Sequence, residues 1–371
     1  MEKSVLEVNV DDLNTGGVYS LVKNVIENKD ESVHIDIASI EKFDKQEHID
    51  ELNKYGTEVF WIGGRKNKVL KQIFCYLNLK HLLEEKRYSC VHIHADVANK
   101  LLISGLAAKN AKVEKVILHS HAAGVDGDHR AIKKMIHFFC RGFLKNIGTD
   151  LVACSDVAAK WMFPNVEMSE INIINNGVQL NKFRYNKEVR IRVRKELGMD
   201  NCFLIGHVGR FAYQKNHIFL IKVFSELVKQ KENVRLLLVG EGPLEQKIRQ
   251  LVEEKKLNDK VIFYGTSTCV EKLFQAMDVF ALPSHFEGLP IVGVEAQASG
   301  LPVVFSDQIT KKAKLTSSIA FLSIDDSEIN KWVETLIGFM SIPRVDTYNQ
   351  MKSEGYDLMD TVQKFLTLYK R

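Results

Sequence analysis

The chain lacks several features that would assign it quickly to a class of protein. Its six cysteines are scattered along 371 residues without a close pair, so no disulfide framework is indicated and we expect reduced thiols. No apolar run is long enough to cross a bilayer, and the first residues, MEKSVLEVNVDD, contain no signal-peptide pattern. The 51 basic and 47 acidic residues nearly cancel, which does not favour nucleic-acid binding. We therefore expect a cytoplasmic protein with no nucleic-acid partner.

The sequence does contain a repeated alternation of strand-like and helix-like runs. VLEVNV, CVHIHA, VILHSH and DLVACS mark strands in the first half, and FLIGHV, RLLLVG, VIFYG, DVFAL and PVVFS mark strands in the second. Such alternation predicts α/β domains with parallel sheets covered on both faces by helices. Between the halves, residues 185–200 are charged and less apolar. We expect the run IRVRK at 191–195 to be a solvated helix face.

The length suits two domains, and the 45% hydrophobic content is ample for two cores. We predict a first domain over 1–183 and a second over 184–355. Ligands of open α/β sheets bind at the carboxyl ends of the strands. We therefore expect the functional motifs, each of which follows a strand, to face one cleft.

The stretch PSHFEGLPIVGVEAQASGLP at 283–302 organises the second half. Pro290 suits the first turn of a helix, and Gly300 suits the left-handed position just past the helix end. Glu287 and Glu295 stand on either side of the helix start, with seven residues between them. A helix N-terminus after a strand is a natural anion site. Carboxylates beside it indicate that hydroxyl groups, such as those of a sugar or ribose, bind there as well.

The segment EGLPIVGVEAQASGLPVV resembles the signature of retaining glycosyltransferases of the GT-B class, in the large family that includes capsular, exopolysaccharide and mannosyl transferases. The resemblance runs over nearly the whole chain and is strongest from 205 to 305. It implies two doubly wound, Rossmann-like domains whose parallel sheets face a central cleft. It also implies that the C-terminal helix, 356–371, crosses back to the first domain.

The resemblance assigns the donor site to the second domain. GHVGRFAYQKN matches the family element in which Arg210 and Lys215 bind the donor diphosphate, and two fixed cations can stabilise charge on it as the sugar departs. Gly209 would let the backbone approach the ligand. Glu287 would approach the donor sugar as a catalytic residue, and Glu295 would bind the ribose hydroxyls.

Backbone groups complete this expected donor site. The N–H groups of Gly288, Leu289 and Ile291 are expected to contact the phosphate or the sugar. The resemblance further implies that residues 264–266 lie beside the nucleotide base. These residues are Tyr264, Gly265 and Thr266.

The first domain contributes a glycine loop and histidines. Gly16 and Gly17, in NTGGVYSL, resemble the family's N-terminal glycine loop, although a plain turn explains them equally well. His119 is the best match to the family's catalytic histidine at a strand end, and His121 is second. His94 is expected to shape the acceptor side of the pocket.

Two further patterns in this half could in principle bind a metal. The pairs His92/His94 and His119/His121 could place four imidazoles together for zinc, but strand histidines are more often packed or hydrogen-bonded. Asp126 and Asp128 resemble the metal motif of the GT-A architecture, which normally has one nucleotide-binding domain. We therefore expect no metal site.

The segment 130–147, RAIKKMIHFFCRGFLKNI, is a predicted helix that combines basic and large apolar residues. Its apolar positions are explained by a core helix. Alternatively, the basic residues lie against anionic lipid headgroups, which would suit an acceptor attached to a lipid carrier.

The expected function is retaining transfer of a sugar from a nucleotide-sugar, in particular a UDP-sugar, to a glycan or lipid-linked glycan acceptor in capsule or exopolysaccharide biosynthesis. No carboxylate can be assigned as a nucleophile for double displacement, so the resemblance implies same-face attack without metal or other cofactor. The enzyme is expected in the cytoplasm or at the inner face of the cell membrane. Two alternatives stay open: a sugar-nucleotide epimerase of the same architecture, and a non-catalytic partner subunit.

Overall fold

The computed structural model describes residues 3–12, 17–64, 68–127 and 129–371. The chain divides into two compact units, Met1–Gly177 with Leu358–Arg371 (unit 1) and Val178–Asp357 (unit 2). The first division falls at 177/178 rather than at the predicted 183/184. The reason is the short helix α7 (Leu180–Phe183), which packs on α11, α12 and α14 of unit 2.

Unit 1 contains a seven-stranded sheet in the order β3-β2-β1-β4-β5-β6-β7. All of its strand pairs are parallel. The strands are β1 (Lys3–Val8), β2 (Val33–Ser39), β3 (Val59–Trp61), β4 (Cys90–Ala95), β5 (Lys115–Ser120), β6 (Asp150–Ala153) and β7 (Ile171–Ile173). Every residue of β4 is buried, as expected for a parallel strand covered on both faces.

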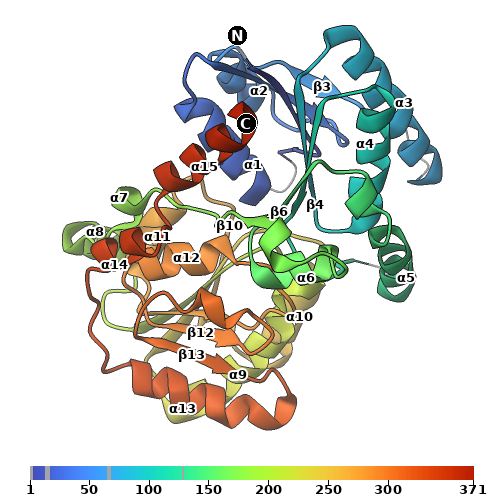
Figure 1. Cartoon of the computed structure of the whole chain (residues 1–371). Coiled ribbons are helices and arrows are strands. Elements are labelled where there is room, and N and C mark those ends of the chain that lie inside the picture. The colour runs from blue at the N-terminus through green and yellow to red at the C-terminus, as the bar shows by residue number, and fades with distance from the viewer. Residues whose placement is uncertain (1–2, 13–16, 65–67, 128) are drawn as a thin grey trace. The chain divides into compact units, whose positions relative to one another are not determined.

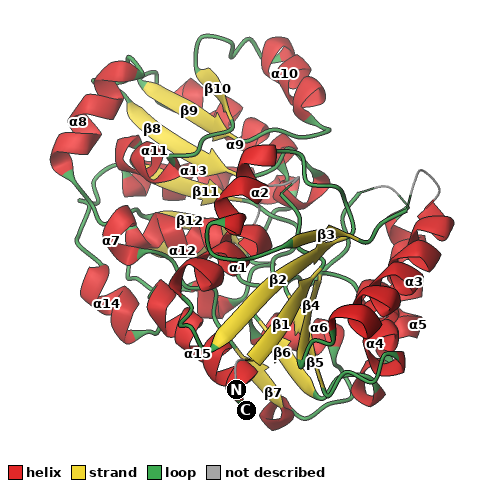
Figure 2. Ribbon diagram, turned by 90° about the horizontal axis from the view of Figure 1, so that it is seen from above, coloured by secondary structure: helices red, strands yellow, loops and turns green. Residues whose placement is uncertain are grey.

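Helices cover both faces of this sheet. They are α1 (Gly17–Asn28), α2 (Gln46–Asn53), α3 (Lys68–Lys86), α4 (Ala98–Asn110), α5 (Arg130–Arg141), α6 (Asp156–Met162) and α15 (Leu358–Lys370). The C-terminal helix α15 packs on α1 and β1, and Figure 1 shows it alongside α1. Its buried Phe365 and Tyr369 join the core formed by Val22, Ile26 and Ile35. On another side of the sheet, α4 packs against α3 and α5 (Figure 2).

Unit 2 contains a six-stranded parallel sheet in the order β10-β9-β8-β11-β12-β13. The strands are β8 (Phe203–Val208), β9 (Val234–Val239), β10 (Val261–Gly265), β11 (Val279–Leu282), β12 (Val303–Ser306) and β13 (Ile319–Leu322). The remaining helices of the unit are α8 (Lys187–Glu196), α9 (His217–Gln230), α10 (Glu245–Glu254), α11 (Val270–Ala276), α12 (Ile291–Ala298), α13 (Ile329–Phe339) and α14 (Tyr348–Ser353). Phe219, Phe224 and Trp332 anchor its core. Both units therefore have the parallel α/β architecture that the alternation predicts.

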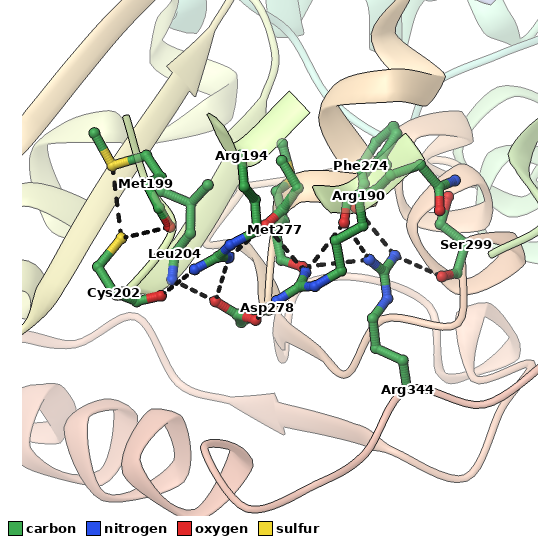
Figure 3. Close-up of polar contacts among 12 residues, drawn as sticks. Arg190, Arg194, Met199, Cys202, Leu204, Phe274, Met277, Asp278, Ser299 and Arg344 are labelled. Atoms are coloured by element: carbon green, nitrogen blue, oxygen red, sulfur yellow. Dashed lines mark hydrogen bonds and ion pairs between the residues drawn. The ribbon is translucent and has the colours of Figure 1, made fainter. Parts of the chain in front are cut away.

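One expectation about unit 2 is only partly confirmed. Ile191, Arg192 and Lys195 of α8 are exposed. Arg194 of the same run and the preceding Arg190 instead reach the carboxyl end of α11, as Figure 3 shows. Arg190 Nη1 donates to the Met277 carbonyl at 2.7 Å, and Arg194 Nη1 donates to the Ala276 carbonyl at 2.8 Å. Both guanidinium groups also pair with Asp278. Cations at a helix C-terminus satisfy its unpaired carbonyls, so these two arginines are structural.

Among the described residues, no helix combines the length and the apolar character needed to cross a bilayer. The six cysteines all lie among the described residues, none of them forms a disulfide, and four of them are buried.

Candidate functional site

Most of the predicted donor-site residues of unit 2 follow the two strands at the centre of its sheet. Strand β8 has β9 on one side and β11 on the other, so the strand order reverses between β8 and β11. This topological switch point is where doubly wound sheets bind ligands, at the carboxyl ends of the strands. The segments 209–216 and 283–290 follow β8 and β11 directly. The two strongest sequence motifs therefore meet at the expected ligand-binding edge.

Lys215 and Glu287, both predicted as catalytic, form an ion pair. Lys215 Nζ lies 2.7 Å from Glu287 Oε1, and Ser284 Oγ donates to the same oxygen at 2.8 Å. Gln214 Nε2 donates to Glu287 Oε2 at 3.1 Å. Only 6% of Glu287 is exposed. Three donors thus hold a buried carboxylate in one orientation beside a lysine ammonium.

The backbone explains how these side chains meet. A 3₁₀ turn over Tyr213–Lys215 aims Gln214 and Lys215 together, and the His285 N–H donates to the Gln214 carbonyl at 2.8 Å. The rings of Tyr213 and His285 stack with centroids 4.2 Å apart. On the other side, Ser306 Oγ donates to the Ser284 carbonyl at 2.6 Å. The loops after β8 and β11 and the end of β12 are therefore held together at this edge.

Gly209 lies under the side chain of Lys215. A Cβ built on Gly209 would stand 3.1 Å from three carbons of the Lys215 stem, so the glycine makes room for that stem. The neighbouring Gly240 has φ +132°, and a Cβ there would lie 2.3 Å from the Gly209 carbonyl oxygen. Gly240 is thus required for the loops after β8 and β9 to pack against each other.

The start of α12 leaves backbone donors available. The helix begins at Ile291 after Pro290, close to the predicted position. Within the described part of the chain, the N–H groups of Gly288, Leu289 and Ile291 donate no hydrogen bond to protein atoms. Unpaired N–H groups at a helix N-terminus attract anions. Gly288 and Leu289 are themselves buried, so these donors are held in place.

Glu295 lies on α12 in a setting that opposes its ionisation. Burial raises the pKa of Glu295 to about 7, and the negative charge of Glu271 adds to this rise. Lys182 and Lys215 act in the opposite direction. Its carboxyl group therefore changes charge near neutral pH. A carboxyl group with a raised pKa near Lys215 is suited to forming hydrogen bonds with a ligand.

The other predicted donor-site residues lie at the ends of β8 and β10, and all are at least partly exposed. Arg210 is exposed, and its guanidinium group contacts no charged or hydrogen-bonding group among the described residues. Tyr264 is 42% exposed at the end of β10, and Thr266 is exposed after it. Gly265 between them has φ +77°. The structure does not bring Arg210 into the Lys215–Glu287 pair.

The predicted histidines of unit 1 form a buried hydrogen-bonded cluster. In register, His92 of β4 lies opposite Glu7 of β1, and His94 lies opposite His119 of β5. His94 Nε2 lies 2.6 Å from Glu7 Oε2, and His94 Nδ1 lies 2.8 Å from His121 Nε2. His92 Nε2 lies 3.1 Å from His119 Nδ1. Glu7, His92 and His119 are 0% exposed, whereas His121 is half-buried.

A consistent set of donors follows from these distances. His119 Nδ1–H donates to His92, and His121 Nε2–H donates to His94. His94 in turn donates directly to Glu7. His92 donates to the Tyr369 hydroxyl, which donates to Glu7. At the His119 end of the network, the buried Nε2 has no hydrogen-bond partner among the described residues. The network therefore ends there in an unpaired imidazole nitrogen.

Electrostatics agree with an ionised Glu7 carboxylate and with neutral imidazoles at His94, His119 and His121. Burial alone would raise the pKa of Glu7, but attraction to His92 and His94 outweighs it and holds that pKa well below its usual range. Burial lowers the pKa of His94 to about 4, and burial with the neighbouring histidines lowers the pKa of His119 well below normal. The Tyr369 hydroxyl keeps its proton, because burial and Glu7 raise its pKa far above normal.

Three of these histidines are also close enough to be considered as metal ligands. Ligand atoms of His92, His94 and His119 lie within 4.8 Å of one another. A zinc ion would need a lone pair from each imidazole at about 2.0–2.1 Å. The lone pairs of His92 and His94 are already engaged in hydrogen bonds from His119 and His121. The cluster could therefore hold zinc only by giving up those hydrogen bonds.

The two remaining motifs of unit 1 lie partly outside the described residues. Gly16 lies outside them, while Gly17 is the first residue of α1. Asp128 also lies outside them, and Asp126 accepts a hydrogen bond through its carbonyl from Lys133 Nζ at 2.8 Å.

Sequence reasoning did not identify several residues of these two clusters. Ser284 and Gln214 stand directly beside the motifs that contain Glu287 and Lys215, so their position was a usable signal. Glu7 is a lone acid in an apolar strand, VLEVNV, which also indicates a buried partner. Nothing in the sequence pairs it with Tyr369, which lies 362 positions away.

Comparison with known proteins gives consistent results. A family model described as Glycosyl transferases group 1 matches residues 189–357. EpsF of Bacillus subtilis (strain 168), to which glycosyltransferase activity is attributed, is 30% identical over 379 residues, covering 99% of this chain and 96% of EpsF. The UDP-Gal:alpha-D-GlcNAc-diphosphoundecaprenol alpha-1,3-galactosyltransferase of Escherichia coli is 23% identical over 318 residues, 82% of this chain and 81% of that enzyme.

The fold comparison extends over both units. The crystal structure of Anabaena Alr3699/HepE in complex with UDP-glucose superposes with a TM-score of 0.79, at 16% identity, and covers 99% of each chain. At this identity the likeness concerns the fold. The full-length similarity to EpsF and the match to the family model together show that this chain belongs to the group 1 glycosyl transferases and has their GT-B architecture of two Rossmann-like domains.

Proposed function

We propose that the protein transfers a sugar, with retention of anomeric configuration, from a UDP-sugar to a glycan or lipid-linked glycan acceptor in capsule or exopolysaccharide synthesis. The observation that carries the proposal is the Lys215–Glu287 pair, which lies next to unpaired N–H groups at the switch point of unit 2. The named relatives support the donor and acceptor classes. One is named for a UDP-Gal donor and a diphosphoundecaprenol-linked acceptor, and another was crystallised with UDP-glucose.

Donor binding follows from the charges at this edge of unit 2. A nucleotide diphosphate carries about two negative charges, which Arg210, Lys215 and the start of α12 can stabilise together. Glu295 accepts hydrogen bonds from the ribose hydroxyls, and Glu287 orients the donor sugar. The loop 264–266 lies beside the base, and Gly16 and Gly17 approach the ligand through their backbone. No metal ion is required, because these groups supply the positive charge.

The transfer step breaks the bond between the anomeric carbon and the diphosphate oxygen and forms a bond from that carbon to the acceptor oxygen. Glu287 is not assigned as a nucleophile in this scheme, because the contacts from Lys215, Ser284 and Gln214 stabilise its carboxylate and lower its nucleophilicity. The acceptor therefore attacks from the face that the diphosphate leaves, and the diphosphate takes the acceptor's proton. Charge on the departing diphosphate is stabilised by Arg210 and Lys215.

On the acceptor side we assign His119 as the catalytic histidine, with His121 and His94 beside it. The Nε2 of His119 has no hydrogen-bond partner among the described residues, so its lone pair can accept a hydrogen bond from a ligand. Because its Nδ1–H donates to His92, the tautomer that exposes this lone pair is fixed.

A thermal-shift panel with UDP-, GDP-, ADP- and CMP-sugars, with and without EDTA, tests donor binding, because a ligand of the native state raises the melting temperature. We expect a shift with a UDP-sugar that EDTA does not abolish. Product analysis with and without acceptor then separates transfer from epimerisation, which needs no acceptor. No shift with any nucleotide, or turnover that EDTA abolishes, would overturn the proposal, and a shift without any turnover would favour a non-catalytic subunit.

A further inference from the structure

Helix α5 of unit 1 exposes a continuous apolar face. Ile132, Met135, Ile136, Phe139 and Phe143 are 54%, 66%, 42%, 71% and 48% exposed. Their spacing of three, one, three and four residues places them on one side of the helix and its immediate continuation. Single exposed apolar residues are ordinary, but five large ones on one face are not. A surface of this kind is normally covered by a partner.

The helix is held with this face directed away from the protein. In α5 only His137 and Cys140 are buried. The Ala98 N–H donates to His137 Nδ1 at 3.0 Å, and His137 Nε2 donates to the Trp161 carbonyl at 3.1 Å. The rings of His137 and Trp161 stack at 4.0 Å. The apolar face therefore cannot be buried by rolling the helix inward without losing these contacts.

The charge around the apolar face has one sign. Residues 129–149 contain no acidic side chain. Basic residues are frequent in the same segment, namely Arg130, Lys133, Lys134, Arg141 and Lys145. Lys133 and Arg141 donate to backbone carbonyls, and Lys145 pairs with Glu170 at 3.4 Å. An apolar face opposite a cationic one is typical of helices that lie in the surface of an anionic membrane.

A second apolar stripe lies on a neighbouring helix. On α3, Leu70, Ile73, Phe74 and Leu77 are 48%, 51%, 42% and 53% exposed, at positions that share one face. Helices α3 and α5 both pack on α4, and both views show the three together on the same side of unit 1 (Figures 1 and 2). This stripe was not predicted from the sequence. It extends the apolar area of this side beyond α5.

We infer that unit 1 docks on an anionic bilayer surface through the apolar face of α5, with the stripe on α3 as an adjoining contact. A second copy of the chain fits less well, because a two-fold interface would set Lys133 and Lys134 against their own copies. A bilayer offers both the apolar interior and the negative headgroups that this face requires. This inference goes beyond sugar transfer and does not depend on the identity of the donor.

Vesicle co-sedimentation of the full chain, without nucleotide, tests the inference. We expect binding to phosphatidylcholine vesicles in which about a third of the lipid is phosphatidylglycerol, and weaker binding to phosphatidylcholine alone or at high salt. The double variant Met135→Ser/Phe139→Ser should lower binding at least about tenfold, and Lys134→Gln about fivefold. Ile191→Ser on α8, where the side chain is 58% exposed, is the matched control and should bind as the parent does.

The outcomes are distinct. The double variant should keep the parent's melting temperature, because both side chains project outward. Absence of binding to the anionic vesicles, or binding that the double variant does not weaken, would overturn the inference. The inference would also be overturned if the parent protein did not bind vesicles and light scattering showed that it is a dimer, whereas the double variant is a monomer. None of these results bears on the UDP-sugar shift, so the two proposals fail separately.

Discussion

Two charged clusters of unit 2 use their polar groups in opposite ways. In the arginine cluster of Figure 3, Arg344 donates to the carbonyls of Phe274, Gln275 and Ser299 at 3.0, 2.6 and 2.6 Å. Arg190 and Arg194 belong to the same cluster: they donate to the Met277 and Ala276 carbonyls, and both pair with Asp278. At the switch point, by contrast, the Arg210 guanidinium and the N–H groups at the start of α12 have no protein partner among the described residues.

This difference separates structural charge from charge kept for a ligand. A cluster whose donors end on protein acceptors stabilises the fold, since breaking it leaves buried groups unsatisfied. A cluster with ordered but unpaired donors adds less to stability and is available to a diphosphate. Substitutions in the two clusters should therefore affect different measurements.

The largest effect is expected from Lys215→Ala. We expect kcat to fall about 100-fold or more, because the positive charge beside the departing diphosphate is lost. Stability should fall less than in the arginine cluster, because the buried Glu287 carboxylate loses its cation but keeps the hydrogen bonds from Ser284 and Gln214. Initial rates with the preferred UDP-sugar measure the effect. Lys222→Ala, which removes an exposed lysine paired with Asp326, is the control, and equal activity in the two variants would refute the role of Lys215.

Arg344→Met should give the converse result. Three carbonyls lose their donor inside the protein, so we expect the free energy of unfolding to fall by about 3 kcal/mol. Denaturant titration measures this loss, and the folded variant should bind the UDP-sugar as tightly as the parent. Arg249→Met removes an arginine that is half exposed and paired with Glu245 one turn away, so it should cost less than about 0.5 kcal/mol. If Arg344→Met cost no more than Arg249→Met, the cluster would not be structural.

The sequence predicted the fold and much of the candidate site because both depend on local patterns. Strands alternate with helices in each unit, and the motifs that contain Lys215 and Glu287 follow strands directly. The structural role of Arg194 was missed for a physical reason. Its partners, Ala276 and Asp278, lie more than 80 positions away, and a charged helix face does not reveal that carbonyls at the end of another helix will cover it.

The histidine cluster shows the same limit. Alternation along β4 and β5 placed the histidines on shared faces, but not the acid that organises them. Glu7 lies 87 positions from His94, and the network closes only because α15 brings Tyr369 onto β1. The boundary at 177/178 was also missed, since α7 is assigned to unit 2 by contacts with helices that are distant in the sequence.

Glu295→Gln tests the donor-site cluster through the pH dependence of stability and of UDP-sugar binding. The pKa of Glu295 rises from 4.5 to about 7 on folding, so the folded state favours the neutral carboxyl and loses stability as the pH rises from 4.5 through 7. The shift corresponds to about 3 kcal/mol at most, and partial exposure reduces this to about 1–2 kcal/mol. The variant should therefore be more stable than the parent by this amount at pH 8 and equal to it at pH 4.5.

The same variant should bind the UDP-sugar about tenfold more weakly at pH 8, where the parent offers an ionised carboxylate to the ribose hydroxyls. Unfolding and binding titrations at pH 4.5, 6 and 8 measure both effects. A parent protein whose stability relative to the variant does not change with pH would contradict the raised pKa, and unchanged binding would remove Glu295 from the donor site.

The smallest effect is expected from Gly209→Ala. The added methyl group would meet the Lys215 stem at 3.1 Å, and the flexible stem can move by a few tenths of an ångström. We therefore expect kcat to fall only about two- to fivefold, with little change in stability. Gly338→Ala on α13, where a Cβ meets nothing within 4 Å, is the control and should stabilise the helix slightly. A loss in Gly209→Ala as large as that in Lys215→Ala would mean that the ligand itself contacts the Gly209 backbone. The glycine would then belong with the unpaired N–H groups of α12 rather than with the packing of Lys215.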